Sequence, residues 1–231
     1  MTLEQLAIFH DITHVLTVPV AILVPVWYSS RYGYSRKKGI SYSVAQMIII
    51  VLFTYGCKWV CGWFGYTIFI NAARTFLAIP LFTLALCKLW KIGTWEGADF
   101  ITPTVYFART VVLIGCTSLG CGQAVACDWG IYSPNAGFRV FPMDLIDLIA
   151  TFAIGVISLA YAKKLQYRGN GRVFGLSMIC IGVVRHLIQF GSTDRYFGII
   201  GLNDETIISV MSVIMGVIIF HLNDKKQSKN Q

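Results

Sequence analysis

Charged residues are scarce in this 231-residue sequence. They make up only 13% of it, whereas a soluble domain carries roughly 25%. Hydrophobic residues account for 56%. Water is therefore not the main solvent of the folded chain, and a typical soluble globular domain is excluded.

Other common signals are also missing. The first fifteen residues contain no Lys or Arg, so we expect no cleavable signal peptide. We find no internal repeat or low-complexity segment, which predicts a single transmembrane domain over residues 1–231. The seven cysteines are an odd number, and those inside apolar stretches are typical of small buried residues rather than of a disulfide framework.

Apolar stretches of about 20 residues, the length that crosses a hydrocarbon core of about 30 Å, recur along almost the whole chain. We therefore predict an all-α polytopic membrane protein with about seven transmembrane helices. The predicted spans lie near residues 13–30, 42–64, 66–90, 99–122, 142–163, 172–192 and 203–223.

The basic residues of the connecting segments are distributed unevenly. Thirteen follow the first, third, fifth and seventh spans, whereas only Arg139 and Arg195 lie in the connections on the other side. The positive-inside rule then places the N-terminus outside and the C-terminus in the cytoplasm. Such alternation gives no support to a nucleic-acid-binding surface, so we expect no nucleic acid partner despite the net charge of +8.

The remaining four basic residues fall inside spans, where each is costly by roughly 2.5–3.5 kcal/mol near the helix centre. They are Lys58, Arg74, Arg109 and Arg185. The acidic residues expected at that depth are only Asp144 and Asp147. The predicted topology puts all six in the outer half of the membrane, where the excess positive charge indicates an anion such as a phospholipid phosphate. Alternatively, these side chains reach the interface or pair with backbone carbonyls.

Two further groups suggest other chemistry. His10 and His14 have the i, i+4 spacing of a metal-binding pair, but no further ligands are evident, so an interfacial turn before the first span is favoured and no metal or cofactor is expected. Cys116, Cys121 and Cys127 approach the oxidising side. A thiol oxidoreductase usually needs Cys-x-x-Cys, which is absent, so a structural or reversible disulfide is favoured for these residues.

Several segments together resemble the prolipoprotein diacylglyceryl transferase family of bacteria. They are IGCTSLGCG from Ile114, RVFPMDLID across the start of the fifth span, GRVFGLSMICIGVVRHLIQF in the sixth, and GLNDETIIS before the seventh. Gly182 and Arg185 match the family's Gly-x-x-Arg element, whose Arg is essential there. Pro142, Leu145 and Asp147 match the motif of the fifth span, with Asp147 in place of Glu.

Other positions depart from the family pattern. The His and Tyr of the fifth-span motif are Phe141 and Ile146, and the Tyr before the essential Arg is Ile181. The signature Gly-Arg is replaced by Val112 and Leu113, with Arg109 one turn earlier.

The resemblance implies a multi-pass enzyme of the bacterial plasma membrane. It would move the diacylglyceryl group of outer-leaflet phosphatidylglycerol onto the lipobox cysteine of a preprolipoprotein. Arg185, Arg109 and Asp147 are the expected catalytic residues. We expect lipid contacts from Arg74, Asn71, Gln189, Arg139, Gly115 and Gly120. The alternative is a non-catalytic protein on the same fold that binds phosphatidylglycerol or another anionic phospholipid.

The segment 123–141 is predicted to be the longest outer connection. It carries Trp129, Tyr132 and Arg139, residue types that favour a membrane interface. It is interpreted either as a substrate entrance or as a simple anchor.

Overall fold

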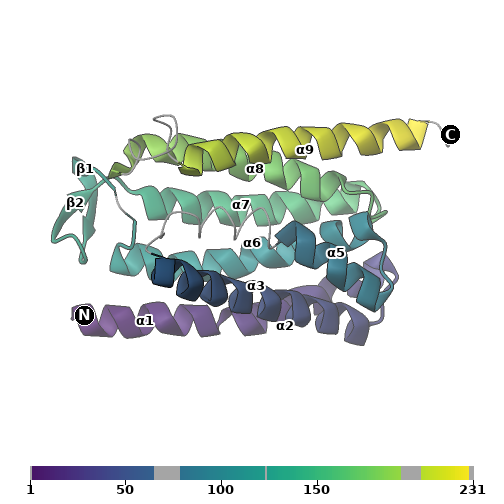
Figure 1. Cartoon of the computed structure of the whole chain (residues 1–231), viewed down its shortest axis with the longest axis horizontal. Coiled ribbons are helices and arrows are strands. Elements are labelled where there is room, and N and C mark those ends of the chain that lie inside the picture. Colours follow the sequence, from purple (N-terminus) through teal and green to yellow (C-terminus); the bar gives the residue numbers. More distant parts are fainter. Residues whose placement is uncertain (1, 65–78, 123, 194–203, 229–231) are drawn as a thin grey trace.

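The structure is a computed structural model that describes residues 2–64, 79–122, 124–193 and 204–228. Long helices run side by side along the molecule, and a small hairpin lies at one end (Figure 1). In chain order the elements are α1 (Leu3–Val15), α2 (Thr17–Tyr28), η1 (Ser29–Tyr32), α3 (Arg36–Phe64), α5 (Ile79–Trp90), α6 (Thr94–Leu119), β1 (Ala126–Ser133), β2 (Phe138–Val140), α7 (Met143–Lys164), α8 (Arg172–Ile188), η3 (Gln189–Gly191) and α9 (Asp204–Ser228). The prediction of a mostly helical fold is confirmed.

Length and apolar composition make four of the described helical segments able to cross a membrane. They are Leu3–Tyr32, Thr94–Leu119, Met143–Lys164 and Arg172–Gly191. A shorter apolar helix, Thr206–Leu222, lies within α9. At 1.5 Å per residue, a helix the length of α6 extends about 39 Å, more than the hydrocarbon core requires.

The first helical segment begins ten residues before the predicted start at residue 13. Thr2 caps α1, because its hydroxyl accepts the backbone N–H of Gln5 while the Gln5 side chain accepts the N–H of Thr2. This reciprocal capping box is a strong helix start signal. Apolar content alone misses it because the first turns of α1 are partly polar.

Helix α6 begins at Thr94, before its predicted start at Asp99, so this acid lies in the second turn of the helix. Asp99 is 1% exposed, and its carboxylate accepts the backbone N–H groups of Gly171 (2.8 Å) and Phe174 (2.9 Å). Asp99 thus satisfies donors at the N-terminus of α8, where a negative charge is also favoured by the helix dipole. It adds a third carboxylate to the expected Asp144 and Asp147, at the other end of the bundle.

The other predicted spans coincide with helices, with ends that differ by a few residues. Those at 42–64, 142–163, 172–192 and 203–223 correspond to α3, α7, α8 with η3, and α9. The span predicted at 66–90 is described only over α5, since residues 65–78 lie outside the described part.

The segment predicted as a plain loop, 123–141, contains an antiparallel hairpin. Tyr132 pairs with Arg139, and Ser133 pairs with Phe138, across a turn of four residues that ends at Gly137. Gly137 has φ of 77°, a left-handed conformation that suits glycine. Aromatic and branched residues on both sides of Pro-Asn-Ala-Gly are the sequence signal for this hairpin.

The two ends of the bundle differ in character. The N-terminus lies at the hairpin end, and α9 finishes at the opposite end (Figure 1). At that opposite end, the Arg31 guanidinium donates to the Tyr167 hydroxyl at 2.7 Å, and Lys38 Nζ donates to the Lys91 carbonyl at 3.4 Å. Basic residues that are far apart in the sequence are therefore gathered at one end.

Small residues let α8 and α9 pack closely. A Cβ atom placed on Gly182 would lie 2.7 Å from the Ser209 carbonyl oxygen, and one on Gly216 would lie 2.7 Å from the Gly175 carbonyl oxygen. Close backbone approach through small residues is typical of helices packed within membranes. The contact at Gly182 fixes the rotation of α8 one turn before Arg185.

Candidate active site

Three helices bring their charged side chains to one point. Arg109 of α6 donates from Nη2 to Asp147 Oδ2 of α7 at 2.8 Å, and Arg185 of α8 donates from Nη1 to the same oxygen at 2.9 Å. The three residues expected to be catalytic from the sequence are thus in direct contact. One carboxylate joins two guanidiniums, so the Arg–Asp–Arg cluster carries a net charge of +1.

The carboxylate of Asp147 is deeply buried and fully engaged. Asp147 is 3% exposed, and its second oxygen, Oδ1, accepts the Thr151 hydroxyl at 3.2 Å. Thr151 lies four residues later on the same face of α7, which is the spacing that brings two helical side chains together. The burial and the three donors make Asp147 a fixed acceptor that orients both guanidiniums.

Neighbouring contacts hold the helices that carry the two arginines. One turn before Arg109, the Tyr106 hydroxyl donates to the Ser177 backbone carbonyl of α8 at 3.2 Å. On the other side of α8, Gly182 packs against α9. The first contact restricts movement of α8 relative to α6 and the second restricts it relative to α9, so together they keep Arg185 facing Asp147.

Arg109 retains an unused donor inside the structure. Its Nε is buried, and the described residues provide no hydrogen-bond partner for it. An unsatisfied buried donor is costly, by about 1–3 kcal/mol and more for charged groups. The site therefore favours a further acceptor beside Arg109, and an anionic oxygen is well suited to that position.

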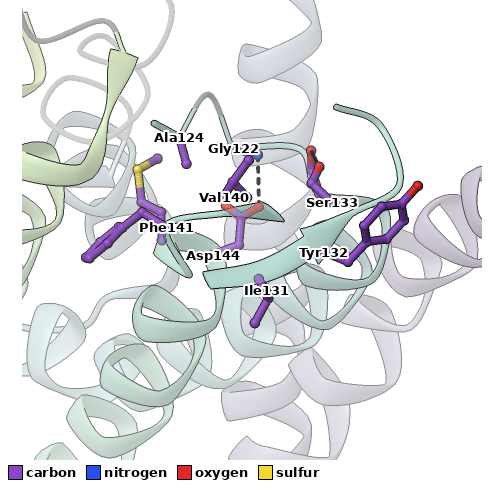
Figure 2. Close-up of a pocket in the computed structure, with 10 residues that line it drawn as sticks. Gly122, Ala124, Ile131, Tyr132, Ser133, Val140, Phe141 and Asp144 are labelled. Atoms are coloured by element: carbon purple, nitrogen blue, oxygen red, sulfur yellow. Dashed lines mark hydrogen bonds between the residues drawn. The ribbon is translucent and has the colours of Figure 1, made fainter. Parts of the chain in front are cut away.

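A small pocket lies one turn from Asp147, beneath the hairpin (Figure 2). Asp144 lines it and accepts the backbone N–H of Gly122 at 2.8 Å, a bond drawn in Figure 2. The pocket residues are Gly120, Gly122, Ala124, Ile131, Tyr132, Ser133, Val140, Phe141, Met143 and Asp144. Its walls combine the end of α6, the hairpin and the start of α7.

The chain on either side of the hairpin is tied to the end of α8. The Val125 N–H donates to the Gly191 carbonyl, and the Phe141 N–H donates to the Val125 carbonyl, each at 2.9 Å. Phe141, the residue at the family's His position, packs against Gly191 and makes an edge-to-face contact with Trp129, with ring centroids 5.7 Å apart. Apolar packing thus replaces an ionisable group at this position.

The residues expected to contact lipid lie in several places. Gln189 is buried one turn beyond Arg185. Arg139 donates to the Gly130 carbonyl within the hairpin at 3.1 Å. Gly115 faces α1, and Gly120 ends α6 with φ of 75°. Arg74 and Asn71 lie outside the described residues.

Some residues that support the site or lie near it were not predicted from the sequence. The signal for Thr151 was available in its i, i+4 spacing from Asp147. No local signal links Tyr106 to Ser177, or His10 to Cys116 and Cys121, a group of possible metal ligands at the hairpin end. These residues are separated by about one hundred positions or belong to helices whose rotation is fixed only by packing.

The fold and the site together define a mostly helical protein with candidate membrane spans and a cationic Arg–Asp–Arg cluster around a buried carboxylate. The sequence model of the prolipoprotein diacylglyceryl transferase family matches residues 74–222. The chain belongs to this family, and the resemblance inferred from its motifs is confirmed.

Two curated relatives show the same likeness. The chain is 28% identical over 154 residues to phosphatidylglycerol–prolipoprotein diacylglyceryl transferase 2 of Clostridium perfringens (strain 13 / Type A), covering 63% of this chain and 59% of the relative. It is 26% identical over 153 residues to phosphatidylglycerol–prolipoprotein diacylglyceryl transferase of Clostridium tetani (strain Massachusetts / E88), covering 63% and 60%. The matched segment thus spans about 60% of the length of these relatives.

Proposed function

We propose that this chain is a diacylglyceryl transferase of the bacterial plasma membrane. Its substrates would be phosphatidylglycerol, or another anionic phospholipid, and the lipobox cysteine of a preprolipoprotein. Membership of the family and the names of the two relatives support this activity. The observation that carries the assignment is the pair of guanidiniums on Asp147 with the unsatisfied Arg109 Nε beside them.

The reaction places a specific electrostatic demand on the site. The thiol sulfur forms a bond to the glyceryl carbon, the bond from that carbon to the phosphate oxygen breaks, and the thiol proton is released to solvent. Glycerol phosphate leaves with the bonding electron pair, so one additional negative charge develops on the phosphate. Preorganised donors aimed at developing charge are usually the largest contribution to catalysis.

The charge of the Arg–Asp–Arg cluster suits this demand. Asp147 neutralises one of the two guanidiniums, so these three residues together sum to +1, which favours the phosphate of the lipid. Arg109 Nε provides a buried in-plane donor, and an interaction with an anionic oxygen there is stronger than in bulk solvent. Asp147 is poorly placed to take the thiol proton, because three donors already occupy its oxygens.

A lipidation assay tests the proposal. In a bacterium depleted of its own transferase, expression of this chain is expected to restore thioether modification of a reporter lipoprotein, detected by mass spectrometry of its N-terminal peptide. The control reporter carries Ser in place of the lipobox Cys and stays unmodified. An inserted, stable protein that leaves the first reporter unmodified would refute the transferase assignment.

The assay also separates the second candidate, a phospholipid-binding protein without catalysis. The observation that favours this candidate is the apolar packing of Phe141 and Ile181, which stand at family His and Tyr positions. Retained phosphatidylglycerol binding without reporter lipidation would support it.

We also propose that the chain crosses the membrane seven times, with the hairpin end outside the cytoplasm. The basic residues gathered at the opposite end support a cytoplasmic position for that end. On the hairpin, Trp129, Tyr132 and Phe138 are at least half exposed. Aromatic side chains of this kind are enriched where a membrane protein meets the lipid headgroups.

Reporter fusions are expected to show this orientation. Alkaline phosphatase fused after Asn135 should be active, because the hairpin would lie outside, whereas fusions after Gly39 and Gly169 should be inactive. A cytoplasmic fluorescent reporter at the same positions should give the inverse pattern and serves as the control. An inactive phosphatase at Asn135, with a fluorescent partner, would reverse the orientation.

A further inference from the structure

A second polar group lies at the hairpin end, on α1 and α6 and in the turn that follows α6. His10 Nε2 is 3.8 Å from Cys116 Sγ. The ligand atoms of His10, Cys116 and Cys121 all lie within 4.8 Å of one another. The Arg–Asp–Arg cluster uses none of these residues, so the group is separate from the proposed active site.

Local structure explains why these residues meet. Gly115 has no side chain, and a Cβ there would lie 2.9 Å from the His10 Cα, so α1 approaches α6 closely at this level. Gly120 then adopts φ of 75° and reverses the chain, so that the Cys121 N–H donates to the Cys116 carbonyl at 3.1 Å. The turn brings Cys121 back to the side of Cys116.

The imidazole of His10 is oriented by a neighbouring carboxylate. Its Nδ1 lies 3.3 Å from Asp11 Oδ1. With the proton on Nδ1, the Nε2 atom presents its lone pair toward Cys116. A carboxylate that holds the other nitrogen of a metal-binding histidine is a common supporting feature of zinc sites.

We propose that His10, Cys116 and Cys121 form a binding site for a thiophilic divalent cation of the Zn²⁺ class. Two thiolates and one imidazole are among the ligand sets that zinc favours, with bonds of about 2.3 Å to sulfur and about 2.0 Å to nitrogen. In a tetrahedron with such bonds, nitrogen and sulfur lie about 3.5 Å apart. The His10–Cys116 distance is already close to this value, and the third ligand needs only a small side-chain movement.

The charges of this site also match the cation. Two thiolates balance a divalent ion, so the three ligands and the ion together are neutral. Three protein ligands leave a fourth position for water or a small ligand. The metal would join the N-terminal helix α1 to the end of α6.

Cobalt binding tests the proposal directly. Full-length protein in detergent micelles, reduced and freed of reductant, is expected to bind one Co²⁺ with a thiolate-to-cobalt absorption band that Zn²⁺ removes. Cys116→Ser, Cys121→Ser and His10→Gln should each weaken binding by more than about 100-fold, since loss of a supporting residue alone costs about 10–100-fold. Asp11→Asn should fall within that smaller range.

Matched controls and a second measurement keep the test decisive. Cys127→Ser in the hairpin and His186→Gln in α8 should keep the affinity of the parent. In native membranes, Zn²⁺ should slow maleimide labelling of the exposed Cys121, and a chelator should restore it, but not in His10→Gln. Absence of the absorption band, equal affinity in the ligand variants, or a Cys116–Cys121 disulfide in protein isolated with excess Zn²⁺ would overturn the proposal.

Discussion

Asp147→Asn is expected to lower the free energy of unfolding by about 3–5 kcal/mol, which is the loss associated with removing one partner of a buried ion pair. Asp147 is the shared acceptor of Arg109 and Arg185. An amide can accept a hydrogen bond but supplies no charge, so two guanidiniums would face each other across a buried neutral group. Equilibrium unfolding in mixed detergent micelles, followed by circular dichroism, measures the change.

Asp144→Asn is the matched control for this prediction. Asp144 lies one turn earlier on the same helix and accepts the Gly122 backbone N–H, which an Asn side-chain oxygen can also accept. We expect a loss below about 1.5 kcal/mol, the upper range for one ordinary hydrogen bond. Equal losses for the two variants would show that charge neutralisation at Asp147 contributes little.

A second substitution tests whether the stability lost in Asp147→Asn comes from unpaired charge or from a change in side-chain shape. If unpaired positive charge causes the loss, Arg109→Gln in the Asp147→Asn background should recover part of the lost stability, because one of the two facing charges is removed. The two changes would then be strongly non-additive, as is usual for groups in one network. Simple addition of the two losses would contradict this interpretation.

Arg185→Lys is expected to lower the rate of reporter lipidation by about 10- to 150-fold. This range corresponds to the loss of one hydrogen bond to a charged group, about 1.5–3 kcal/mol. A lysine ammonium can retain the charge next to Asp147, but it cannot donate in a plane to Asp147 and to a phosphate at the same time. The rate is measured in isolated membranes and normalised to the amount of inserted protein.

The same measurement on Arg109 tests whether the two arginines share one phosphate. Arg109→Lys is expected to have a smaller effect than Arg185→Lys, because Arg185 alone matches the family's essential position. The double variant should lose less than the product of the two single effects if both guanidiniums bind one anion. A product of independent effects would indicate separate roles.

Arg31→Lys provides the control for the substitution of an arginine outside the proposed site. Arg31 donates to the Tyr167 hydroxyl at the opposite end of the bundle, a contact that an ammonium can replace. Its effect should stay within about twofold, as for a typical surface change. Full lipidation activity and phosphatidylglycerol binding in a folded Arg185→Ala protein would refute the role assigned to Arg185.

The sequence by itself determined the helical character, most helix positions and the family. These follow from local properties, namely runs of apolar residues, the uneven distribution of basic residues, and short motifs such as Gly182 with Arg185. Depth in the membrane also follows from position along a span, so Arg109, Asp147 and Arg185 were expected in one layer. Capping and turn signals were present at Thr2 and Gly137, but apolar content alone does not register them.

Only the tertiary structure decided which of these residues touch. Lipid tails are about as apolar as the side chains on a membrane helix, so an apolar face can lie against lipid or against another helix. Hydropathy therefore does not fix the rotation of one helix against another. Close packing at Gly115 and Gly182 does, and it turns Arg185 toward Asp147 and brings His10 to Cys116. Two guanidiniums on one carboxylate, and an imidazole beside two thiols, are consequences of that packing.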